Sequence, residues 1–484
     1  MNGFRLTGTH GHMTADELAR GIVRMRRLYS RLRPRVLALD MENTVAWILA
    51  DLAALESDIP TVPLPHFFTD AQRVHALRDS GADWVLSDRP DAVDRPPVPL
   101  HAFDTIEIAD QALNALRISR SPALLPEGTA KITYTSGTTG EPKGVCLDRI
   151  SMLDVAASLV SACELSGSDV HLCALPLPTL LENIGGIYAM RQAGAVTVVL
   201  PSSDIGLSGM AGFDGHQLMA QLREHGASTV ILVPQMLAGL VDAVEDAGAR
   251  LPQLRFVAVG GAPVSATLIG RARRCGLPVY EGYGLSECAS VVALNTPRAC
   301  KDGSVGRALP HARIEVRNDE LYVTGATALG YVGAGTRPAG PWPTGDLGYL
   351  DDDGYVHLTG RRRNMFVTAF GRNVAPEWVE SELTAQPAIA QAAVFGESRP
   401  WLSAVIVSAS REAVDDAVAA ANRMLPDYAQ VRRWITVDTP FTFASGEITA
   451  NGRLRRDVLL QRHGRQIEAL YADARHTETY KENA

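Results

Sequence analysis

A loop rich in glycine and hydroxyl side chains is the feature that most constrains this chain. Residues 134–145 read Tyr-Thr-Ser-Gly-Thr-Thr-Gly-Glu-Pro-Lys-Gly-Val and follow residues 131–134, which predict a short strand. Glycines let backbone N–H groups converge on an anion, while hydroxyls add donors and lysine adds positive charge. The loop therefore predicts a polyphosphate site formed by Thr135, Ser136, Gly137, Thr138, Thr139, Gly140 and Lys143. The spacing is not that of a Walker loop, and a surface turn is the alternative.

The length and composition of the chain predict a folded protein with more than one hydrophobic core. The chain has 484 residues, of which 46% are hydrophobic and 21% charged, and this size predicts two to four packing units. A net charge of −8 argues against nonspecific nucleic-acid binding. The six cysteines show no C-x-x-C pairing, which predicts reduced thiols. The N-terminus lacks a signal-peptide pattern and charges interrupt residues 36–55, so we expect a cytoplasmic protein without a membrane span.

Apolar runs that alternate with helical segments predict an α/β fold. Strands are predicted at residues 36–39, 61–64, 84–87, 170–175, 196–200, 229–233 and 257–260, and helices at residues 15–32, 44–55, 70–78, 151–162 and 216–225. Such alternation is typical of parallel sheets covered by helices. Asn43 and Thr69 are the expected N-caps of two of these helices. The helix at residues 15–32 carries many arginines on one side, and residues 315–324 alternate as one antiparallel strand does.

A domain boundary is predicted near three consecutive arginines, Arg361 to Arg363. The acidic turn at residues 351–354 precedes them, and about 120 residues with their own α+β pattern follow. Strands are expected there at residues 366–368, 389–395 and 403–407, with helices at residues 378–383 and 412–424. We therefore expect a large domain at residues 1–361 and a small domain at residues 362–484.

Two further segments carry residue types that suit a nucleotide. Gly260, Gly261 and Ala262 follow an apolar strand and would allow close approach of a flat base, although an ordinary turn explains them equally well. In residues 281–287, Tyr283 could stack on a purine and Ser286 could donate to a phosphate oxygen. Glu287 offers the hard carboxylate oxygen that Mg²⁺ prefers. A glycine-rich loop with a capping glutamate is the alternative.

The loop at residues 134–145 resembles the phosphate-binding signature of the adenylate-forming superfamily, which includes acyl-CoA synthetases, luciferases and peptide-synthetase adenylation domains. Similarity extends over residues 12–471, is closest to the long-chain acyl-CoA synthetase branch, and includes the Tyr-Gly-x-[Thr/Ser]-Glu motif at residues 283–287. The resemblance implies parallel sheets, a β-barrel-like part and a small C-terminal domain that rotates on a hinge. It assigns the ribose to Asp346 and Arg361, base contacts to Gly260, Gly261, Ala262, Tyr283 and Gly284, the hinge to Arg363, and the thiol-step loop to Gly371 and Arg372.

The sequence departs from this family at two positions. Arg453 stands where a lysine normally clamps the substrate carboxylate, and a guanidinium fork differs in geometry from a compact ammonium. Thr179 stands where the long-chain branch usually has a histidine or aromatic residue that gates the pocket. The substrate pocket is expected to include Thr179, Asn183, Gly186, Gln235 and Gly261, whereas His171 and His311 are expected to be structural.

The predicted reaction is ATP- and Mg²⁺-dependent activation of a carboxylic acid as an acyl-adenylate. Glu287, Arg453, Lys143 and Ser286 are the expected catalytic residues, with Glu287 as the metal ligand. A thiol from coenzyme A or from carrier-protein phosphopantetheine then takes the acyl group. One alternative is adenylation of a small oxyacid such as nitrite for N–N bond formation with an amine. The other is a nucleotide-binding relative without catalysis. The sequence leaves the acid, the acceptor and the oligomeric state open.

Overall fold

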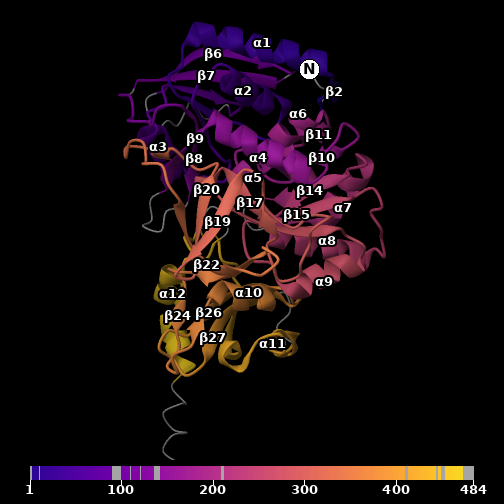
Figure 1. The fold of residues 1–484 in the computed structure, drawn as a ribbon, viewed down its shortest axis with the longest axis vertical. Coiled ribbons are helices and arrows are strands. Elements are labelled where there is room, and N and C mark those ends of the chain that lie inside the picture. Colours follow the sequence, from indigo (N-terminus) through magenta and orange to yellow (C-terminus); the bar gives the residue numbers. More distant parts are fainter. Residues whose placement is uncertain are drawn as a thin grey trace, which may run out of the picture.

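The computed structural model describes residues 3–9, 11–89, 100–109, 111–119, 121–135, 142–208, 212–408, 413–442, 445–448 and 453–471. The molecule is elongated, with the N-terminal helices at one end and the C-terminal strands and helices at the other (Figure 1). Among the described residues, no helix is both long and apolar enough to cross a membrane.

The first sheet has eight strands in the order β21-β9-β8-β4-β3-β5-β7-β6. Its parallel strands are β8 (Thr129–Thr135), β4 (Thr61–Pro63), β3 (Leu37–Asp40) and β5 (Trp84–Ser87). Antiparallel strands flank them: β21 (Gly330–Tyr331) and β9 (Lys143–Asp148) on one side, β7 (Gln111–Ile118) and β6 (Leu100–Ile108) on the other. Leu37 and Leu39 face the interior of the molecule, while Ala38 packs in the cluster that contains α3 (Asp70–Asp79).

The second sheet has nine strands in the order β18-β17-β16-β15-β14-β10-β11-β1-β2. Its six parallel strands are β16 (Val279–Leu285), β15 (Phe256–Val259), β14 (Thr229–Leu232), β10 (Val170–Leu172), β11 (Val196–Val198) and β1 (Arg5–Gly8). The antiparallel edges are β18 (Arg307–Ala308), β17 (Ser290–Leu294) and β2 (Gly11–Met13). The predicted α/β arrangement with parallel sheets is therefore confirmed.

Helices pack on both faces of this second sheet. One face carries α7 (Gly215–Glu224), α8 (Pro234–Asp246) and α9 (Ala266–Arg274). Between the two sheets lie α2 (Val45–Glu56), α4 (Arg149–Ala162), α5 (Leu180–Glu182), the π-helix η2 (Asn183–Ala189) and α6 (Met190–Ala193). The helix α1 (Ala15–Leu32) packs on α2 at the outer end of the molecule (Figure 1). A small hairpin, β12 (Leu207–Ser208) and β13 (Gly212–Phe213), and the short helix η3 (Ser202–Ile205) precede α7.

A four-stranded antiparallel sheet follows, in the order β19-β20-β22-β23. Its strands are β19 (Ala312–Arg317), β20 (Glu320–Gly325), β22 (Trp342–Leu350) and β23 (Val356–Arg361). The single strand expected at residues 315–324 is wrong, because the chain reverses at Asn318 and Asp319, whose φ angles are 49° and 61°. Asn and Asp adopt this left-handed conformation more readily than other non-glycine residues, and such a pair makes a tight hairpin turn.

The residues after β23 build cores of their own. A short pair, β24 (Phe366–Val367) and β25 (Asn373–Val374), leads into α10 (Pro376–Thr384). A three-stranded sheet of β26 (Ile389–Phe395), β27 (Leu402–Ser408) and β28 (Val431–Val437) packs with α11 (Val414–Asn422) on one face and α12 (Arg456–Ala469) on the other. A one-turn helix, η6 (Asp427–Ala429), precedes β28.

Two expected helix N-caps have different outcomes. Thr69 caps α3 in a complete capping box with Gln72, as predicted. The cap of α2 is Thr44, not Asn43, because the Thr44 hydroxyl accepts from the backbone of Trp47. Asn43 instead bridges to a distant segment: its amide donates to the Leu175 carbonyl at 2.9 Å and accepts from the Leu177 N–H at 2.8 Å. This correction shows that Asn43 anchors the loop before α5.

Candidate active site

The carboxyl ends of the parallel strands of the second sheet meet at one cavity. Val233 follows β14, Gly260 follows β15, and Leu285 ends β16; all three residues lie in the cavity wall. The cavity has a volume of about 1200 Å³. Ligand sites in open α/β sheets lie at this edge of the strands, so the topology itself places a binding site here.

The predicted phosphate loop falls in the chain between β8 and β9. Thr135 ends β8 and Lys143 begins β9, and both line the cavity. The predicted loop residues Ser136, Gly137, Thr138, Thr139 and Gly140 lie outside the described residues. The Lys143 ammonium lies 5.7 Å from the centre of the Tyr331 ring, a cation–π distance. Lys143 is thus positioned at the cavity by a contact that the sequence did not indicate.

Glu287 and Ser286 lie on the helical turn η4 (Ser286–Cys288), directly after β16. The backbone turns sharply here, because Ala289 and Ser290 have φ angles of 50° and 96°. Gly284 makes this approach possible, since a Cβ at that position would lie 1.8 Å from the Ser290 carbonyl oxygen. The Tyr331 hydroxyl donates to Glu287 Oε1 at 3.0 Å, and burial together with this carboxylate raises the pKa of Tyr331. The turn therefore presents a carboxylate and a hydroxyl to the cavity, as predicted.

Asp346 is the centre of a second group of predicted residues. It lies on β22 opposite Arg361 of β23, and Arg361 Nε donates to Asp346 Oδ1 at 2.6 Å. The Tyr283 hydroxyl donates to Asp346 Oδ2 at 2.8 Å, and burial, with Asp346 adding to it, raises the pKa of Tyr283 well above its usual value. Burial alone would lower the pKa of Arg361, but Asp346 raises it. The sequence placed these three residues together, and the structure does so.

Arg453 brings the C-terminal part of the chain into the same site. It lines the cavity, and Asp346, Glu287 and Arg361 all act on its charge. The Arg453 side chain is exposed at its surface but is surrounded by many protein atoms. This burial is the main cause that lowers the pKa of Arg453, and the positive charge of Arg361 lowers it further. Two guanidinium groups lie near two carboxylates here, and a guanidinium fork is suited to binding a phosphate group. Arg453 therefore lies at the cavity with Asp346, Glu287 and Arg361, and its role as the substitute for lysine stays a prediction.

The remaining predicted nucleotide and hinge residues divide into two groups. Gly260, Gly261 and Arg363 line the cavity, whereas Ala262 is an exposed residue of the adjoining turn. Gly371 has a φ of 70° in the turn between β24 and β25, and Arg372 follows it. Neither lies among the described cavity residues, and the neighbouring Phe370 is 76% exposed. The structure therefore does not bring this turn to the nucleotide site.

The predicted substrate pocket is only partly assembled. Thr179, Gln235 and Gly261 line the cavity. Asn183 lies elsewhere, in a buried network in which its Oδ1 accepts from the Lys131 ammonium and its Nδ2 donates to Asp51 Oδ2 at 3.0 Å. Lys131 is 1% exposed, and burial lowers its pKa while Asp51 opposes the shift. A buried ammonium requires such partners, so the side chain of Asn183 serves the core and not the cavity wall.

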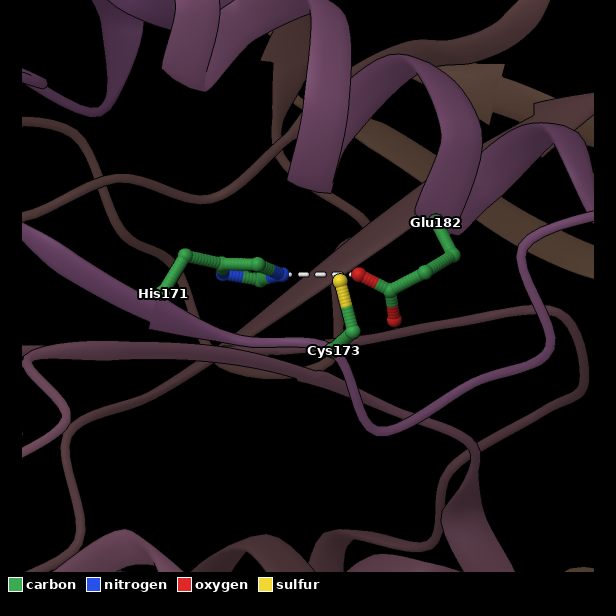
Figure 2. A group of neighbouring side chains, drawn as sticks. All are labelled: His171, Cys173 and Glu182. Atoms are coloured by element: carbon green, nitrogen blue, oxygen red, sulfur yellow. Dashed lines mark hydrogen bonds and ion pairs between the residues drawn. The ribbon is translucent and has the colours of Figure 1, made fainter. Parts of the chain in front are cut away.

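Gly186 also lies away from the described cavity wall, beside a buried pair formed by His171 and Glu182. A Cβ at Gly186 would lie 2.2 Å from Glu182 Oε1, so glycine is needed for this close packing. His171 Nε2 lies 2.7 Å from Glu182 Oε1, and its Nδ1 lies 3.0 Å from the Thr229 hydroxyl. Figure 2 shows Cys173 beside this pair. The ligand atoms of these three buried side chains lie within 4.8 Å of one another, and His171 and Glu182 contact each other directly.

One functional contact was missed by the sequence prediction altogether. Glu382 on α10 is 4% exposed and accepts a hydrogen bond from the Thr267 hydroxyl at 3.1 Å. The Ala266 N–H, in the first turn of α9, also donates to it. A second contact joins the same parts of the chain: Arg362 forms an ion pair with Glu320 of β20 at 2.9 Å. These contacts hold the C-terminal elements against the cavity in the orientation that places Arg453 in the site.

The fold defines a class of protein: an α/β protein whose C-terminal elements reach one large cavity at the carboxyl ends of parallel strands. Residues 3–332 match the family of AMP-binding enzymes, and residues 364–475 match the AMP-binding enzyme C-terminal domain. The chain belongs to the AMP-binding enzyme family. The predicted family and fold class are confirmed, as is the reaction class of an adenylate-forming acid–thiol ligase.

Individual relatives agree with this assignment. The chain is 26% identical to the long-chain-fatty-acid–CoA ligase FadD15 of Mycobacterium tuberculosis, over 88% of this chain and 86% of the relative. It is 28% identical to the 2-succinylbenzoate–CoA ligase of Bacillus subtilis, over 75% of each chain. The fold matches that of the Bacillus subtilis o-succinylbenzoate CoA synthetase with a TM-score of 0.76, at 24% identity over 94% of both chains. The anthranilate CoA ligase AuaEII matches with a TM-score of 0.77, at 18% identity over 97% of this chain and 95% of that one.

Proposed function

We propose that this enzyme activates an extended, largely apolar carboxylic acid with ATP and transfers the acyl group to coenzyme A. One observation carries the proposal: the cavity lined by Lys143, Glu287 and Arg453 is also lined by many apolar side chains, and we call this apolar part the chamber. The walls of that chamber include Leu159, Leu165, Met190, Phe256, Ala258 and Val291. A wall of this composition favours an apolar body over a charged one.

The strands give the length of this chamber. The cavity wall includes both Val233, just after β14, and Thr229, the first residue of β14. Four residue steps along a strand span ~13 Å. Phe256 and Gly260 bracket β15 in the same way. An acid whose carboxylate lies at the nucleotide end would therefore have ~13 Å for its body, as in a medium-chain fatty acid or a fused aryl acid.

A rigid floor closes the far end. The floor consists of Cys163 and Leu165, just after α4. Arg255 holds this segment: its Nη1 donates to the Cys163 carbonyl at 2.9 Å, and its Nε and Nη2 donate to the two carboxylate oxygens of Asp169, each at 2.7 Å. A bidentate Arg–carboxylate pair fixes orientation well. The floor therefore limits the length of the acid.

The residues at the nucleotide end suit attack of a carboxylate on the α-phosphorus of ATP. The new bond joins a carboxylate oxygen to that phosphorus, and the bond to the bridging oxygen of pyrophosphate breaks. Lys143 and Arg453 supply positive charge where negative charge accumulates, a form of electrostatic stabilisation. Glu287 would hold Mg²⁺, which would neutralise phosphate charge, and its carboxylate oxygen is of the type this ion prefers. Asp346 accepts hydrogen bonds and would accept those of the ribose hydroxyls.

Coenzyme A is the acceptor we favour over a carrier protein. The curated relatives above are by name CoA ligases, and their similarity supports this choice. We further propose that the chain divides at residue 361, with residues 362–484 as a domain that turns near Arg363 and brings Gly371 and Arg372 to the thiol. We place the reaction in the cytoplasm, where ATP and coenzyme A occur, and the six cysteines are unpaired.

The experiment is pyrophosphate release from ATP and Mg²⁺ with acids of graded length, each with and without coenzyme A. We expect release with extended apolar acids, thioester formation when coenzyme A is present, and weaker release once the acid exceeds the chamber. Release only with nitrite and an aromatic amine would refute the proposal and favour the diazotising alternative. ATP binding without release under any condition would favour a non-catalytic protein.

A further inference from the structure

The helix α1 carries a straight row of arginines that no part of the proposed reaction uses. Arg20, Arg24, Arg27 and Arg31 are spaced by four, three and four residues and are all exposed. This spacing places the four side chains on one side of the helix, within an arc of about 60° around its axis. The row covers eleven residue steps, from Arg20 to Arg31, or ~16 Å. Its opposite side is buried against the core through Leu18, Ile22, Met25, Leu28, Tyr29 and Leu32.

Within the described part of the chain, three of the four arginines in this row lack a close ion pair, whereas Arg31 has an interaction of its own and Arg20 lies near Glu17. Among the described residues, Arg20, Arg24 and Arg27 form no ion pair within 4.0 Å. Arg26 at the edge of the row has only a long contact, 3.9 Å, to Glu56. The chain as a whole carries −8, so such a concentration of positive charge on one helix is a local exception.

The row also lies at one end of the molecule. Figure 1 shows α1 at the outer end, with the C-terminal elements at the opposite end and the second sheet between them. A flat anionic surface can therefore contact the row while most of the acidic remainder stands farther away than the screening length of ~8 Å. Val23, which is 45% exposed, lies beside the arginines and offers an apolar contact to such a surface.

We propose that the α1 row binds the enzyme to an anionic lipid surface. Juxtaposed arginines attract anionic headgroups, and this attraction falls off within one screening length. The choice of a membrane over a nucleic acid rests in part on the proposed function, because an extended apolar acid partitions into a bilayer. The net negative charge of the chain also opposes an extended polyanion. The apolar side of α1 is buried in the core, so the contact is peripheral and electrostatic, without insertion.

The test is co-sedimentation of the full chain with two kinds of vesicle, phosphatidylcholine alone and phosphatidylcholine mixed with phosphatidylglycerol. We expect binding only to the mixed vesicles, and loss of that binding as salt is raised. The variant R20Q/R24Q/R27Q/R31Q should bind about 100- to 1000-fold more weakly, because each basic residue near an anionic surface contributes roughly fivefold. Glutamine retains good helix propensity, so α1 should stay folded.

A matched control removes the same number of charges from the opposite end of the molecule. R423Q/R432Q/R433Q/R465Q changes four exposed arginines of the C-terminal elements. It should bind mixed vesicles as the unmodified chain does. Equal binding by the two variants, no binding by the unmodified chain, or displacement from vesicles by a DNA duplex would each overturn the proposal. Binding is measured without substrate, so it can be observed even if the enzyme lacks the proposed ligase activity. Absence of vesicle binding would likewise leave the proposed ligase activity untouched.

Discussion

Replacing Glu382 by alanine should separate the two half-reactions of this enzyme. Glu382 lies on α10, yet it contacts Thr267 and Ala266 at the start of α9, more than a hundred residues earlier. The same C-terminal part of the chain carries Arg453 into the site with Asp346 and Glu287. Adenylation therefore depends on a docked orientation that Glu382 helps to hold. In the domain rotation that we propose, thiol attack requires the cavity to open, because C-terminal residues such as Gln386 and Ile389 line it in this orientation.

The structure gives the size of the effect. Alanine removes two hydrogen bonds, each worth roughly 0.5–1.5 kcal/mol net. It also removes a carboxylate at the N-terminus of α9, where negative charge contributes roughly 0.3–1 kcal/mol. These contributions sum to roughly 1.3–4 kcal/mol, and a value of about 2 kcal/mol in the lower half of this range corresponds to a ~30-fold shift of the docking equilibrium. Thr267→Val keeps the shape of the side chain and removes only one of these bonds, so its effect should be ~5-fold.

The assay compares two rates in each variant. ATP–pyrophosphate exchange reports adenylation, and thioester formation from a supplied acyl-adenylate reports the second step. We expect Glu382→Ala to slow exchange ~30-fold while the second step is unchanged or faster. An equal fall in both rates with a lowered melting temperature would mean that Glu382 only supports folding. Unchanged exchange would refute the reasoning that this contact holds Arg453 in place.

Four further results are expected. Asp346→Asn should reduce kcat/KM for ATP about 10- to 100-fold in pyrophosphate release, because it weakens charge-assisted bonds worth roughly 1.5–3 kcal/mol each, with circular dichroism confirming the fold. Arg453→Lys should preserve or raise the exchange rate, and a large loss would show that the guanidinium fork is required. Cys163→Phe should fill the chamber floor and shift preference to shorter acids, while their own kcat/KM stays within a few-fold of the unmodified value. Burial raises the pKa of Glu281 to about 8, so the free energy of unfolding should fall as pH rises from the pKa of an unfolded glutamate towards 8. The melting temperatures at pH 5.5 and pH 8.5 should therefore differ less in Glu281→Gln than in the unmodified enzyme.

The sequence predicted much of the secondary structure because apolar runs bounded by turn residues leave little choice. The strands at residues 84–87 and 389–395 have the predicted bounds. The hairpin turn at Asn318 was missed because its two strands continue one alternating pattern, and only the left-handed preference of Asn and Asp marks the reversal. The π-helix η2 has no local signature.

The side chains expected around a nucleotide lie together because each motif fixes several neighbouring residues at once, while their binding of a nucleotide stays a prediction. Tyr283, Glu287, Asp346 and Arg361 converge as expected, on strands and turns whose ends the sheet topology brings together. Glu382 was missed because its partners are supplied by docking of two parts of the chain. An exposed-looking glutamate on a predicted helix gives no indication that another helix begins beside it.

Asn183 was wrongly predicted to line the substrate pocket, although the sequence contains residues that indicate its place in the core. Residues 131–134 were predicted as a strand, and a strand next to the phosphate loop lies in the interior of the sheet. Lys131 therefore had to be buried, and a buried ammonium needs a carboxylate and further acceptors. Asp51 interrupts an otherwise apolar helix and Tyr188 lies in an apolar run, so both were available as partners, and both contact Lys131 or its neighbours. Asn183 completes the shell around this ammonium, and a search for the partners of Lys131 would have assigned Asn183 to the core before the substrate pocket was considered.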